Sequence, residues 1–548
     1  MARDRLVGLT IAVLALLLPG AAGCGAGATP IGSGASPSPS APREGGTYNF
    51  PLSLENLTLA PFDDMGEARQ VAHQVFEGLV RYESRPDGSL ATVPCLAERW
   101  SANADATVWT FKLRRGVRFQ APVSREVTAE DVVADLEYVA DPASQTVVAY
   151  MLAPIRGTDG FGYAAHGKLR VAALDRYTVR FFLKAPFAEF ADTLGGPATW
   201  VWPVDQLRKV GKARFAEHPI GTGPYRLARW VRGEYVDLTR NLDWWNAGTG
   251  GPYIDTLHFP VFHSVSSEML AFQKGMLDCT WVPAGQVEAS KSLAQVKSGR
   301  WKATAWPSLL TGYLGVNMRD PVVGGAAGLR LRQALSYGHD PVTLLAAMTD
   351  GVYVPLAGLL PPSVPGSGET SPYRYDPAKA ATLFRQAGSP TLRLLHDDSR
   401  RAVVVAHSLK ASYAKLGLTL RLEQKRWDPF LHELARGTHD QLFLIAWIAD
   451  YPSTDNFLHD LFHSRLSPST SCTFYANPDV DRLLALARAT PDQQKRRWLN
   501  ARAERQILAD APVVPLFVAA DYRLTSERIA NLSLNAMGYV DMWTLWVR

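Results

Sequence analysis

The apolar and polar positions of the chain change their period several times, which predicts a mixture of strands and helices. Alternating apolar residues predict short strands at residues 46–50, 109–113, 177–184 and 235–239. Between the first two of these, apolar residues spaced three and four apart predict a helix over residues 66–82. Thr128 is the expected N-cap of a further helix, because Glu130 and Asp131 follow it and suit the positive end of a helix.

The second half of the chain alternates more regularly between the two periods. Strands are predicted at residues 313–318, 391–396, 419–423 and 441–447. Helices are predicted at 329–337 and 402–416. Strands that alternate with helices indicate α/β layers, and we expect a largely parallel sheet. No internal repeat is found at the periods of solenoid proteins.

Two extended stretches separate these halves and suggest two lobes joined by a hinge. One covers residues 301–311, and the other is the apolar, proline-flanked segment 512–518. Rotation can concentrate at a few positions near the ends of such paired crossings. We therefore interpret them as a two-strand hinge.

The N-terminus has the pattern of an export signal. Arg3 and Arg5 precede an apolar run over residues 6–18, which is too short to cross a hydrocarbon core of about 30 Å. Residues 21–24, of sequence AAGC, resemble the lipobox of bacterial lipoproteins, in which the cysteine is acylated. We expect residues 1–23 to be removed and Cys24 to carry a lipid. An ordinary cleavable signal with an incidental cysteine is the alternative.

Residues 24–45 are rich in Gly, Ala, Ser and Pro, which predicts a flexible tether between the lipid and the folded body. No later stretch reaches the roughly 18 apolar residues of a membrane span. The predicted location is therefore the cell membrane, on its extracytoplasmic face, with the body held by the lipid anchor.

Composition and charge narrow the possible functions. The chain has 548 residues, enough for two or three packed units, since single cores stop growing near 250–300 residues. A net charge of +5, scattered along the chain, does not indicate a nucleic-acid partner. Cys95, Cys279 and Cys472 are an odd number, so at least one thiol stays unpaired, and the spacing does not choose a pair. No cysteine or histidine spacing indicates a zinc site, and we predict no cofactor.

Four groups of motifs carry a resemblance to a known family. The first comprises LAERW at 96–100, WTFKLRRGVRF at 109–119 and TAEDV at 128–132. The second comprises PIGTGPY at 219–225 and RNLDWW at 240–245. The third comprises VN at 316–317 and LRLRQALSY at 329–337, and the fourth WIADYP at 447–452 and NPDVD at 477–481. Their order and spacing resemble the family 5 extracellular solute-binding proteins of ABC importers, which serve dipeptides, oligopeptides and nickel.

The resemblance implies an α/β fold similar to the type II periplasmic binding proteins, with two lobes and an extra N-terminal subdomain. It implies lobe I at 46–305 plus 520–548, lobe II at 306–519, and the subdomain at about 82–215. Two positions depart from the family pattern: QAP at 120–122 and GHD at 338–340. These departures make the chain a divergent member.

The resemblance also implies the ligand site. Asp450 matches the acid of the WxADY motif, which receives the α-amino group of a peptide in similar proteins; capping a loop is the alternative role. Trp447 belongs to the same motif, and Trp427 resembles a tryptophan of the side-chain pocket; either ring could instead be interlobe core. Tyr451 is a further predicted contact. Arg400, Arg401, Arg426 and His396 could meet a ligand carboxylate, and the sequence does not select among them.

The expected function is that of a monomeric lipoprotein that captures a short peptide and delivers it to the permease of an ABC importer. A non-peptide solute is the alternative within transport: a nickel chelate, haem or an oligosaccharide. His459 and His463 share a helix face, but two histidines without a third ligand predict a solvated face more than a metal site. No motif of a hydrolase is present, so we predict no enzyme. A sensor or scaffold lipoprotein of the same fold remains open.

Overall fold

The computed structural model describes residues 41–52, 58–63, 68–164, 169–348, 352–366 and 369–548. The predicted signal segment, Cys24 and most of the predicted tether lie outside the described residues. Among the described residues, no helix combines the length and the hydropathy that a membrane span requires.

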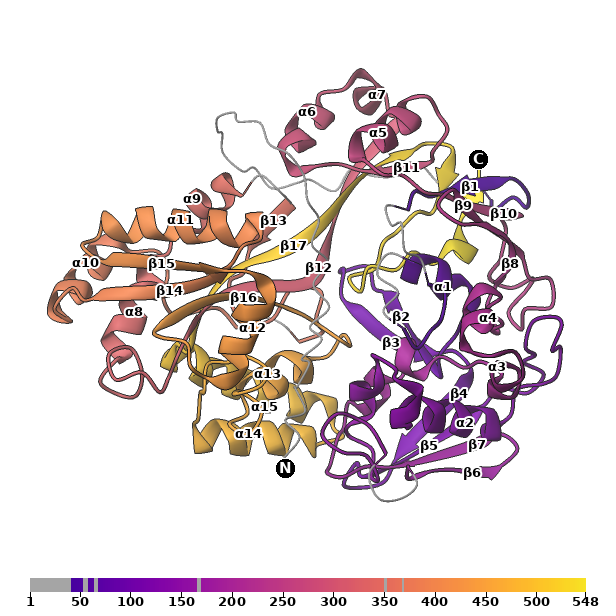
Figure 1. The fold of residues 1–548 in the computed structure, drawn as a ribbon, viewed down its shortest axis with the longest axis horizontal. Helices are drawn as coiled ribbons and strands as arrows, with labels where there is room; N and C mark the ends of the chain where they lie inside the picture. Colours follow the sequence, from indigo (N-terminus) through magenta and orange to yellow (C-terminus); the bar gives the residue numbers. More distant parts are fainter. Residues whose placement is uncertain (1–40, 53–57, 64–67, 165–168, 349–351, 367–368) are drawn as a thin grey trace.

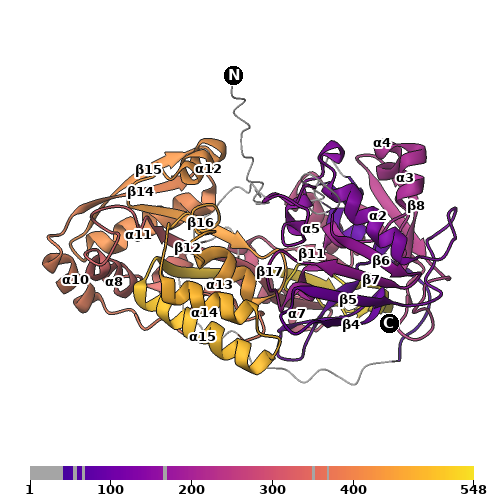
Figure 2. The same ribbon diagram turned by 90° about the horizontal axis from the view of Figure 1, so that it is seen from below.

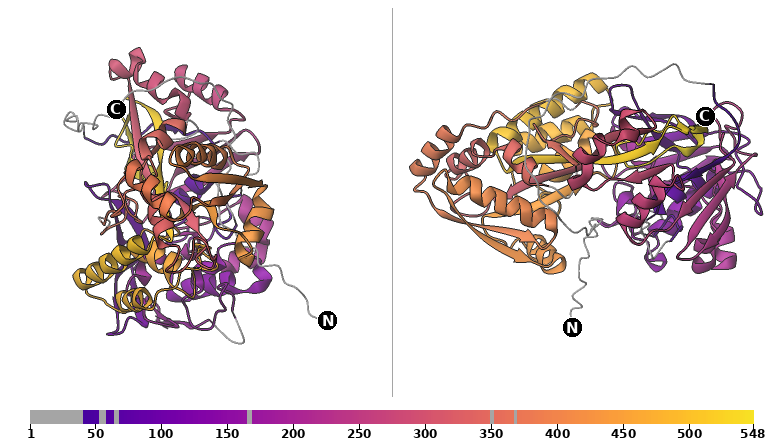
Figure 3. Two further views of the ribbon diagram at one scale, coloured as in Figure 1. Left: turned by 90° about the vertical axis from the view of Figure 1, so that its left-hand side faces the viewer. Right: turned by 90° about the horizontal axis from the view of Figure 1, so that it is seen from above.

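Two lobes lie side by side and are joined by two long strands, β12 (Trp301–Val316) and β17 (Val513–Ser526) (Figure 1). Lobe I holds the elements from β1 to α7 together with β18 and β19, and the C-terminus lies on it (Figure 3). Lobe II holds α8 to α15 with β13 to β16. This is the two-lobed α/β architecture predicted from the sequence. The residue boundaries predicted for the lobes and the subdomain stay predictions.

Lobe I is built on two four-stranded sheets. The first has the order β1-β10-β9-β8, with β1 (Thr47–Asn49), β10 (Thr256–Pro260), β9 (Tyr235–Arg240) and β8 (Tyr225–Val231). The second has the order β4-β5-β7-β6, with β4 (Ala97–Ala102), β5 (Val108–Leu113), β7 (Thr178–Phe182) and β6 (Val171–Asp175). Two pairs stand apart: β2 (Val80–Ser84) with β3 (Leu90–Pro94), and β18 (Ile529–Ala530) with β19 (Trp546–Val547).

The helices of lobe I are α1 (Arg69–Val75), α2 (Ala129–Ala140), α3 (Val204–Val210), α4 (Lys212–Glu217), α5 (Val265–Gln273), α6 (Val287–Lys291) and α7 (Ala294–Lys297). Helices α1 and α2 pack on these sheets, while α5 and α7 pack on strands of the sheet that the joining strands form. Thr128 is the N-cap of α2, as predicted. The backbone N–H of Thr128 donates to the Asp131 carboxylate at 2.8 Å, and the Thr128 hydroxyl donates to it at 3.0 Å.

The sheet of lobe II continues through the two joining strands into lobe I, where the first strand of its order lies. The sheet order is β11-β17-β12-β16-β14-β15, with β11 (Cys279–Trp281), β16 (Leu442–Ile448), β14 (Thr391–Asp397) and β15 (Thr419–Lys425); β13 (Val352–Pro355) also pairs with β17. The helices of lobe II are α8 (Leu329–Tyr337), α9 (Pro341–Ala347), α10 (Pro377–Gln386), α11 (Arg400–Ala414), α12 (Trp427–Arg436), α13 (Thr454–Phe462), α14 (Pro478–Arg488) and α15 (Gln493–Asp510).

The structure corrects two predictions. The largely parallel sheet is wrong: β14 pairs in parallel with β15 and β16, while β12 pairs antiparallel with both β16 and β17. The helix predicted over 66–82 is too long, because α1 ends at Val75 and β2 begins at Val80. Between them, Gly78 packs so closely on the Leu194 carbonyl that an added Cβ would lie 2.6 Å from it, a contact that a continuous helix does not make.

The three described cysteines stay as thiols. Cys95, Cys279 and Cys472 are each buried and unpaired, so no disulfide forms among the described residues. Burial raises the pKa of the Cys279 and Cys472 thiols to about 12, which keeps both protonated and unreactive at neutral pH.

Two glycines let aromatic rings lie flat across the joining strands. Gly315 is paired with Phe443 of β16, and Gly312 with Phe517 of β17. A Cβ on either glycine would come within 2.2 Å of the facing ring. Glycine is needed here because the partner side chain fills the space that a side chain would take.

We therefore expect Gly315→Ala to lower the free energy of unfolding by about 1–3 kcal/mol, because the added methyl group displaces the buried Phe443 ring. Thermal unfolding of lobe II, followed by circular dichroism, measures the effect. Gly160→Ala is the matched control, since a Cβ there meets no atom within 4 Å. Equal unfolding temperatures for the two variants would contradict the packing.

Candidate functional site

Asp450 lies where the two lobes meet. It follows the end of β16 in lobe II, and its Oδ1 accepts a hydrogen bond of 2.6 Å from the Tyr150 hydroxyl of lobe I. Tyr150 belongs to the short 3-10 helix Ala149–Leu152, and its ring is 42% exposed. The contact therefore joins a half-buried carboxylate of one lobe to a solvent-accessible ring of the other.

The surroundings of Asp450 raise the pKa of its carboxyl group towards neutral pH. Burial raises the pKa of its carboxyl to about 6, and the Asp460 charge adds to this rise. The hydrogen bond from Tyr150, together with Asn456 and the positive charge of Arg69, acts in the opposite direction. The carboxyl is thus mostly ionised at pH 7.5 and mostly protonated at pH 5.

Trp447 is held beside Asp450 by one shared partner. The Asn456 side-chain oxygen accepts from the indole Nε1 of Trp447 at 3.2 Å and from the backbone N–H of Asp450 at 3.1 Å. The predicted alternative for Asp450 was a loop cap. In the structure Ser453 is the N-cap of α13 and accepts from the backbone N–H of Asp455 at 3.1 Å.

Trp427 and Trp447 lie at the edge of one apolar cluster. Both are half-buried and pack against a core that includes Phe430 and Phe443 of lobe II and Tyr82 of lobe I. The Trp427 ring lies 5.8 Å from that of Phe430. The structure thus brings the two predicted tryptophans and Asp450 to the same side of lobe II.

Tyr451 lies deeper than the other predicted contacts. Its ring is buried against Phe187 of lobe I at 6.2 Å between centroids. Its hydroxyl lies 3.1 Å from a carboxylate oxygen of Asp455 and 3.0 Å from one of Asp460. A ligand would have to compete with these carboxylates for the hydroxyl, so the predicted ligand contact of Tyr451 stays a prediction.

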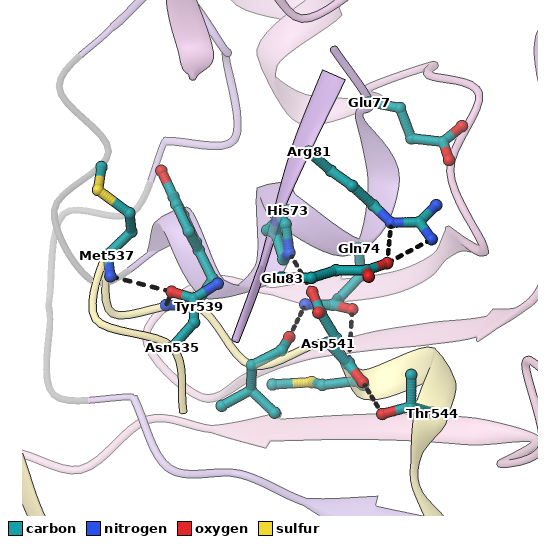
Figure 4. Close-up of polar contacts among 12 residues, drawn as sticks. His73, Gln74, Glu77, Arg81, Glu83, Asn535, Met537, Tyr539, Asp541 and Thr544 are labelled. Atoms are coloured by element: carbon teal, nitrogen blue, oxygen red, sulfur yellow. Dashed lines mark hydrogen bonds and ion pairs between the residues drawn. The ribbon is translucent and has the colours of Figure 1, made fainter. Parts of the chain in front are cut away.

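The facing wall of lobe I is formed by α1 and the C-terminal segment (Figure 4). Gln74 donates to the Val540 carbonyl at 2.9 Å, and His73 lies 2.9 Å from the Asp541 carboxylate. The ring of Tyr539 stacks on that of His73 at 4.5 Å. Burial raises the pKa of both Tyr539 and Asp450, and the positive charge of Arg69, at the start of α1, opposes this rise at each.

A second contact between the lobes was not predicted. Residues 187–189 of lobe I meet the helices α13 to α15 of lobe II, which lie beside lobe I in Figure 2. Glu189 accepts from the Ser453 hydroxyl at 2.9 Å and lies 3.4 Å from the Arg496 guanidinium. The Arg488 guanidinium lies 4.0 Å from the centre of the Phe187 ring. These partners are hundreds of residues apart in sequence, so no local pattern could reveal them.

This contact concentrates acidic groups. Burial raises the pKa of Glu189, while Arg496 lowers it. Burial and the Glu189 charge raise the pKa of Asp192 to about 7, while the Thr92 hydroxyl, which donates to it at 2.5 Å, opposes the rise. Both acids belong to lobe I. Lobe II meets them with Arg496, which lowers the pKa of both, and with Asp455, which raises it to a smaller extent.

One group of side chains has the composition of a metal site. Asp455, His459 and Asp460 each offer a ligand atom, and these atoms lie within 4.8 Å of one another. Arg488 lies 3.3 Å from the Asp455 carboxylate and 3.5 Å from the His459 ring nitrogen. A guanidinium in that position already balances the negative charge and would repel a cation. We interpret the group as an ion-pair network. His463, whose ring centre is 5.0 Å from that of His459, joins the same network.

The candidate partners for a ligand carboxylate are spread over lobe II. His396 is buried with Nδ1 2.7 Å from the Asp397 carbonyl oxygen. Arg401 lines a small pocket with Asp397 and Phe517 between α11 and the sheet. Arg426 is exposed at the start of α12. Arg69 of lobe I is the basic group that acts electrostatically on Asp450, and sequence reasoning missed it because it lies in the other lobe.

Comparison with known proteins places this geometry in a family. The Glutathione-binding protein GsiB of Salmonella choleraesuis (strain SC-B67) is 27% identical over 488 residues, covering 87% of this chain and 89% of the relative. The structure of HbpA2 from Haemophilus parasuis superposes with a TM-score of 0.81 at 23% identity, covering 92% of this chain and all of that one.

A peptide complex is also similar. The periplasmic binding protein DppA from Helicobacter pylori, in complex with the peptide STSA, gives a TM-score of 0.69 at 25% identity, covering 92% of this chain and 98% of that chain. Residues 91–468 match the model of the "Bacterial extracellular solute-binding proteins, family 5 Middle", a span of more than half of the chain. The chain therefore belongs to family 5 of the bacterial extracellular solute-binding proteins, the solute-binding components of ABC importers.

Proposed function

We propose that this protein captures a short peptide with a free amino terminus between its lobes and delivers it to an ABC permease. The observation that carries the proposal is the Asp450 carboxylate, half-buried where the lobes meet. Its closest partner, the Tyr150 hydroxyl, is neutral, so the negative charge remains available to an ammonium group. A charge-assisted hydrogen bond in such a site is stronger than its exposed counterpart.

The neighbouring side chains suit the remainder of a peptide. Trp447 and Trp427 offer large apolar surfaces to side chains of varied shape. Tyr150 and Arg69 approach from lobe I, so a ligand on Asp450 would touch both lobes and favour their closure. The names of GsiB and of the DppA complex support a peptide, since glutathione is itself a tripeptide derivative with an ammonium group.

The proposal includes the setting of this step. A lipid on Cys24 would hold the body at the extracytoplasmic face of the cell membrane, on the tether of residues 24–45. The protein would act as a monomer that docks on the permease and releases its peptide there. It would bind without turnover.

Mass spectrometry of small molecules released from the purified, denatured protein tests the function directly. Co-purifying peptides with free amino termini, together with calorimetric binding of trialanine or reduced glutathione, would support the proposal. Release of a metal chelate, a haem or an oligosaccharide would overturn it in favour of a non-peptide solute. Product formation above one equivalent would show an enzyme.

Removal of the Asp450 charge should weaken binding of peptides that carry an ammonium group. We expect Asp450→Asn to reduce the affinity for trialanine about 10- to 100-fold, because it removes the charge-assisted hydrogen bond. Isothermal titration calorimetry at pH 7.5 measures the loss.

N-acetyl-trialanine is the matched ligand control, since it lacks the ammonium group and should bind the wild type and Asp450→Asn equally weakly. Asp479→Asn is the matched protein control, because that carboxylate is 74% exposed and pairs with Arg482 on α14. An unchanged affinity of Asp450→Asn for trialanine would rule out Asp450 as the anchor.

The affinity for trialanine should also depend on pH. Because the pKa of free Asp450 is about 6, its charge is present above pH 6 and is lost as the pH falls through 6. The peptide keeps its own charges over this range. We expect the affinity to fall by up to about tenfold per pH unit below pH 6.

Tyr150→Phe removes a hydrogen bond that favours the charged carboxylate, so the fall should begin at a higher pH. Titrations between pH 5 and 7.5 measure the affinity profiles of the wild type and of Tyr150→Phe. The affinity of Asp450→Asn should not fall in this way as the pH decreases. A profile that is flat down to pH 5 in the wild type would contradict the role of Asp450.

A further inference from the structure

Asn456 contacts both of the residues that form the centre of the proposed site: the indole of Trp447 and the backbone of Asp450. It lies in the first turn of α13 and is fully buried, at 0% exposure. Its Oδ1 accepts from the Trp447 indole at 3.2 Å and from the Asp450 backbone N–H at 3.1 Å. Its Nδ2 donates to a carboxylate oxygen of Asp460 at 2.9 Å. One amide therefore joins the loop that carries Asp450, the indole of Trp447 and the carboxylate of Asp460 on α13.

The partners determine which way the amide faces. An indole N–H and a backbone N–H can only donate, so they require the oxygen of Asn456. An ionised carboxylate can only accept, so Asp460 requires the nitrogen. Burial raises the pKa of Asp460, but its pairing with His459, the positive charge of Arg488 and the hydrogen bond with Tyr451 lower it below the usual value overall, which keeps it ionised. Exchanging the two ends of the amide would lose all three of these hydrogen bonds, because donors would then face donors and acceptors would face acceptors.

Asp460, which accepts from the amide of Asn456, has further polar partners of its own. Asp460 lies 3.0 Å from the Tyr451 hydroxyl and 3.2 Å from the His459 ring. The Thr470 hydroxyl donates to its backbone carbonyl. The orientation of the amide is thus imposed from the interior of lobe II and passed to the residues at the lobe boundary.

We propose that Asn456 is the positioning residue of the ligand site, which orients the Trp447 indole and the Asp450 backbone through one amide. This inference rests on the proposed function, because it assumes that Trp447 and Asp450 bind the peptide. Asn456 itself touches no ligand; it acts by restricting the loop and the ring before binding, which reduces the entropy that binding must overcome.

The aspartate variant makes a sharp test because its geometry depends on pH. In Asn456→Asp a charged carboxylate keeps the two acceptor bonds but loses the donor to Asp460 and repels it. A protonated carboxyl has one acceptor and one O–H donor and reproduces the amide. We expect the affinity of Asn456→Asp for trialanine to be about tenfold below that of the wild type at pH 8 and to approach the wild-type value at pH 5. Comparison at equal pH corrects for the titration that Asp450 has in the wild type, and a fluorine NMR readout does not depend on peptide binding by Asp450.

A second readout needs no peptide. Fluorine NMR of the protein labelled with 5-fluorotryptophan, with the signal assigned by Trp447→Phe, reports the surroundings of the Trp447 indole. We expect the Trp447 signal to shift or broaden in Asn456→Asp at pH 8, to return towards its wild-type position at pH 5, and to stay displaced in Asn456→Leu at both pH values. A signal unchanged in both variants would overturn the inference.

Asn317→Asp is the matched control. Asn317 is also a buried asparagine of lobe II, but its Nδ2 donates to the His439 carbonyl at 2.8 Å, in another part of the lobe. This variant should leave the Trp447 signal unchanged, which separates positioning from a general loss of stability. If the wild type does not bind trialanine, that peptide is excluded as the ligand, and the fluorine signal alone decides whether Asn456 positions the indole.

Discussion

The antiparallel pair of β12 and β17 is the constraint on which the rest of the structure depends. The two strands are paired from Trp301 and Ser526 near lobe I to Gly315 and Val513 within lobe II. Both therefore belong to the lobe II sheet at one end and extend towards lobe I at the other. Regular pairing is interrupted between Pro307 and Thr311, where proline cannot donate to the ladder. Relative movement of the lobes is thus limited to bending or twisting of one ribbon.

This ribbon also determines where a ligand can be enclosed. The strand β16 pairs with β12, and the loop after β16 carries Asp450 to the boundary between the lobes. There the carboxylate meets Tyr150 and the charge of Arg69, both from lobe I. The site is therefore complete only when both lobes contribute. Partial burial accounts for the raised pKa of Asp450, and the same burial would strengthen a bond to an ammonium group.

Polar groups continue from this site to the second contact between the lobes. Asn456 joins Asp450 and Trp447 to Asp460, and the Tyr451 hydroxyl lies between Asp460 and Asp455. Asp455 pairs with Arg488, whose carbonyl accepts from the backbone N–H of Ala188 in lobe I. The residues of the proposed site and the second lobe contact thus share one polar network in lobe II. A chain of hydrogen bonds and one ion pair therefore connects residues 187–189 to Asp450.

The sequence by itself determined the family and the two-lobed α/β class, and its WIADYP motif predicted the residues of the proposed ligand site. These are local properties: Trp447 and Asp450 stand at the end of a strand that its own apolar residues predict, and Thr128 caps its helix through its own neighbours. Only the tertiary structure decided that most strands pair antiparallel, because a strand has the same period of two in either kind of sheet. Only the tertiary structure brought Tyr150 to Asp450, 300 residues away, and placed Tyr451 among carboxylates. A pattern of polarity records which residues are buried, but the pairing of distant segments depends on how the lobes pack.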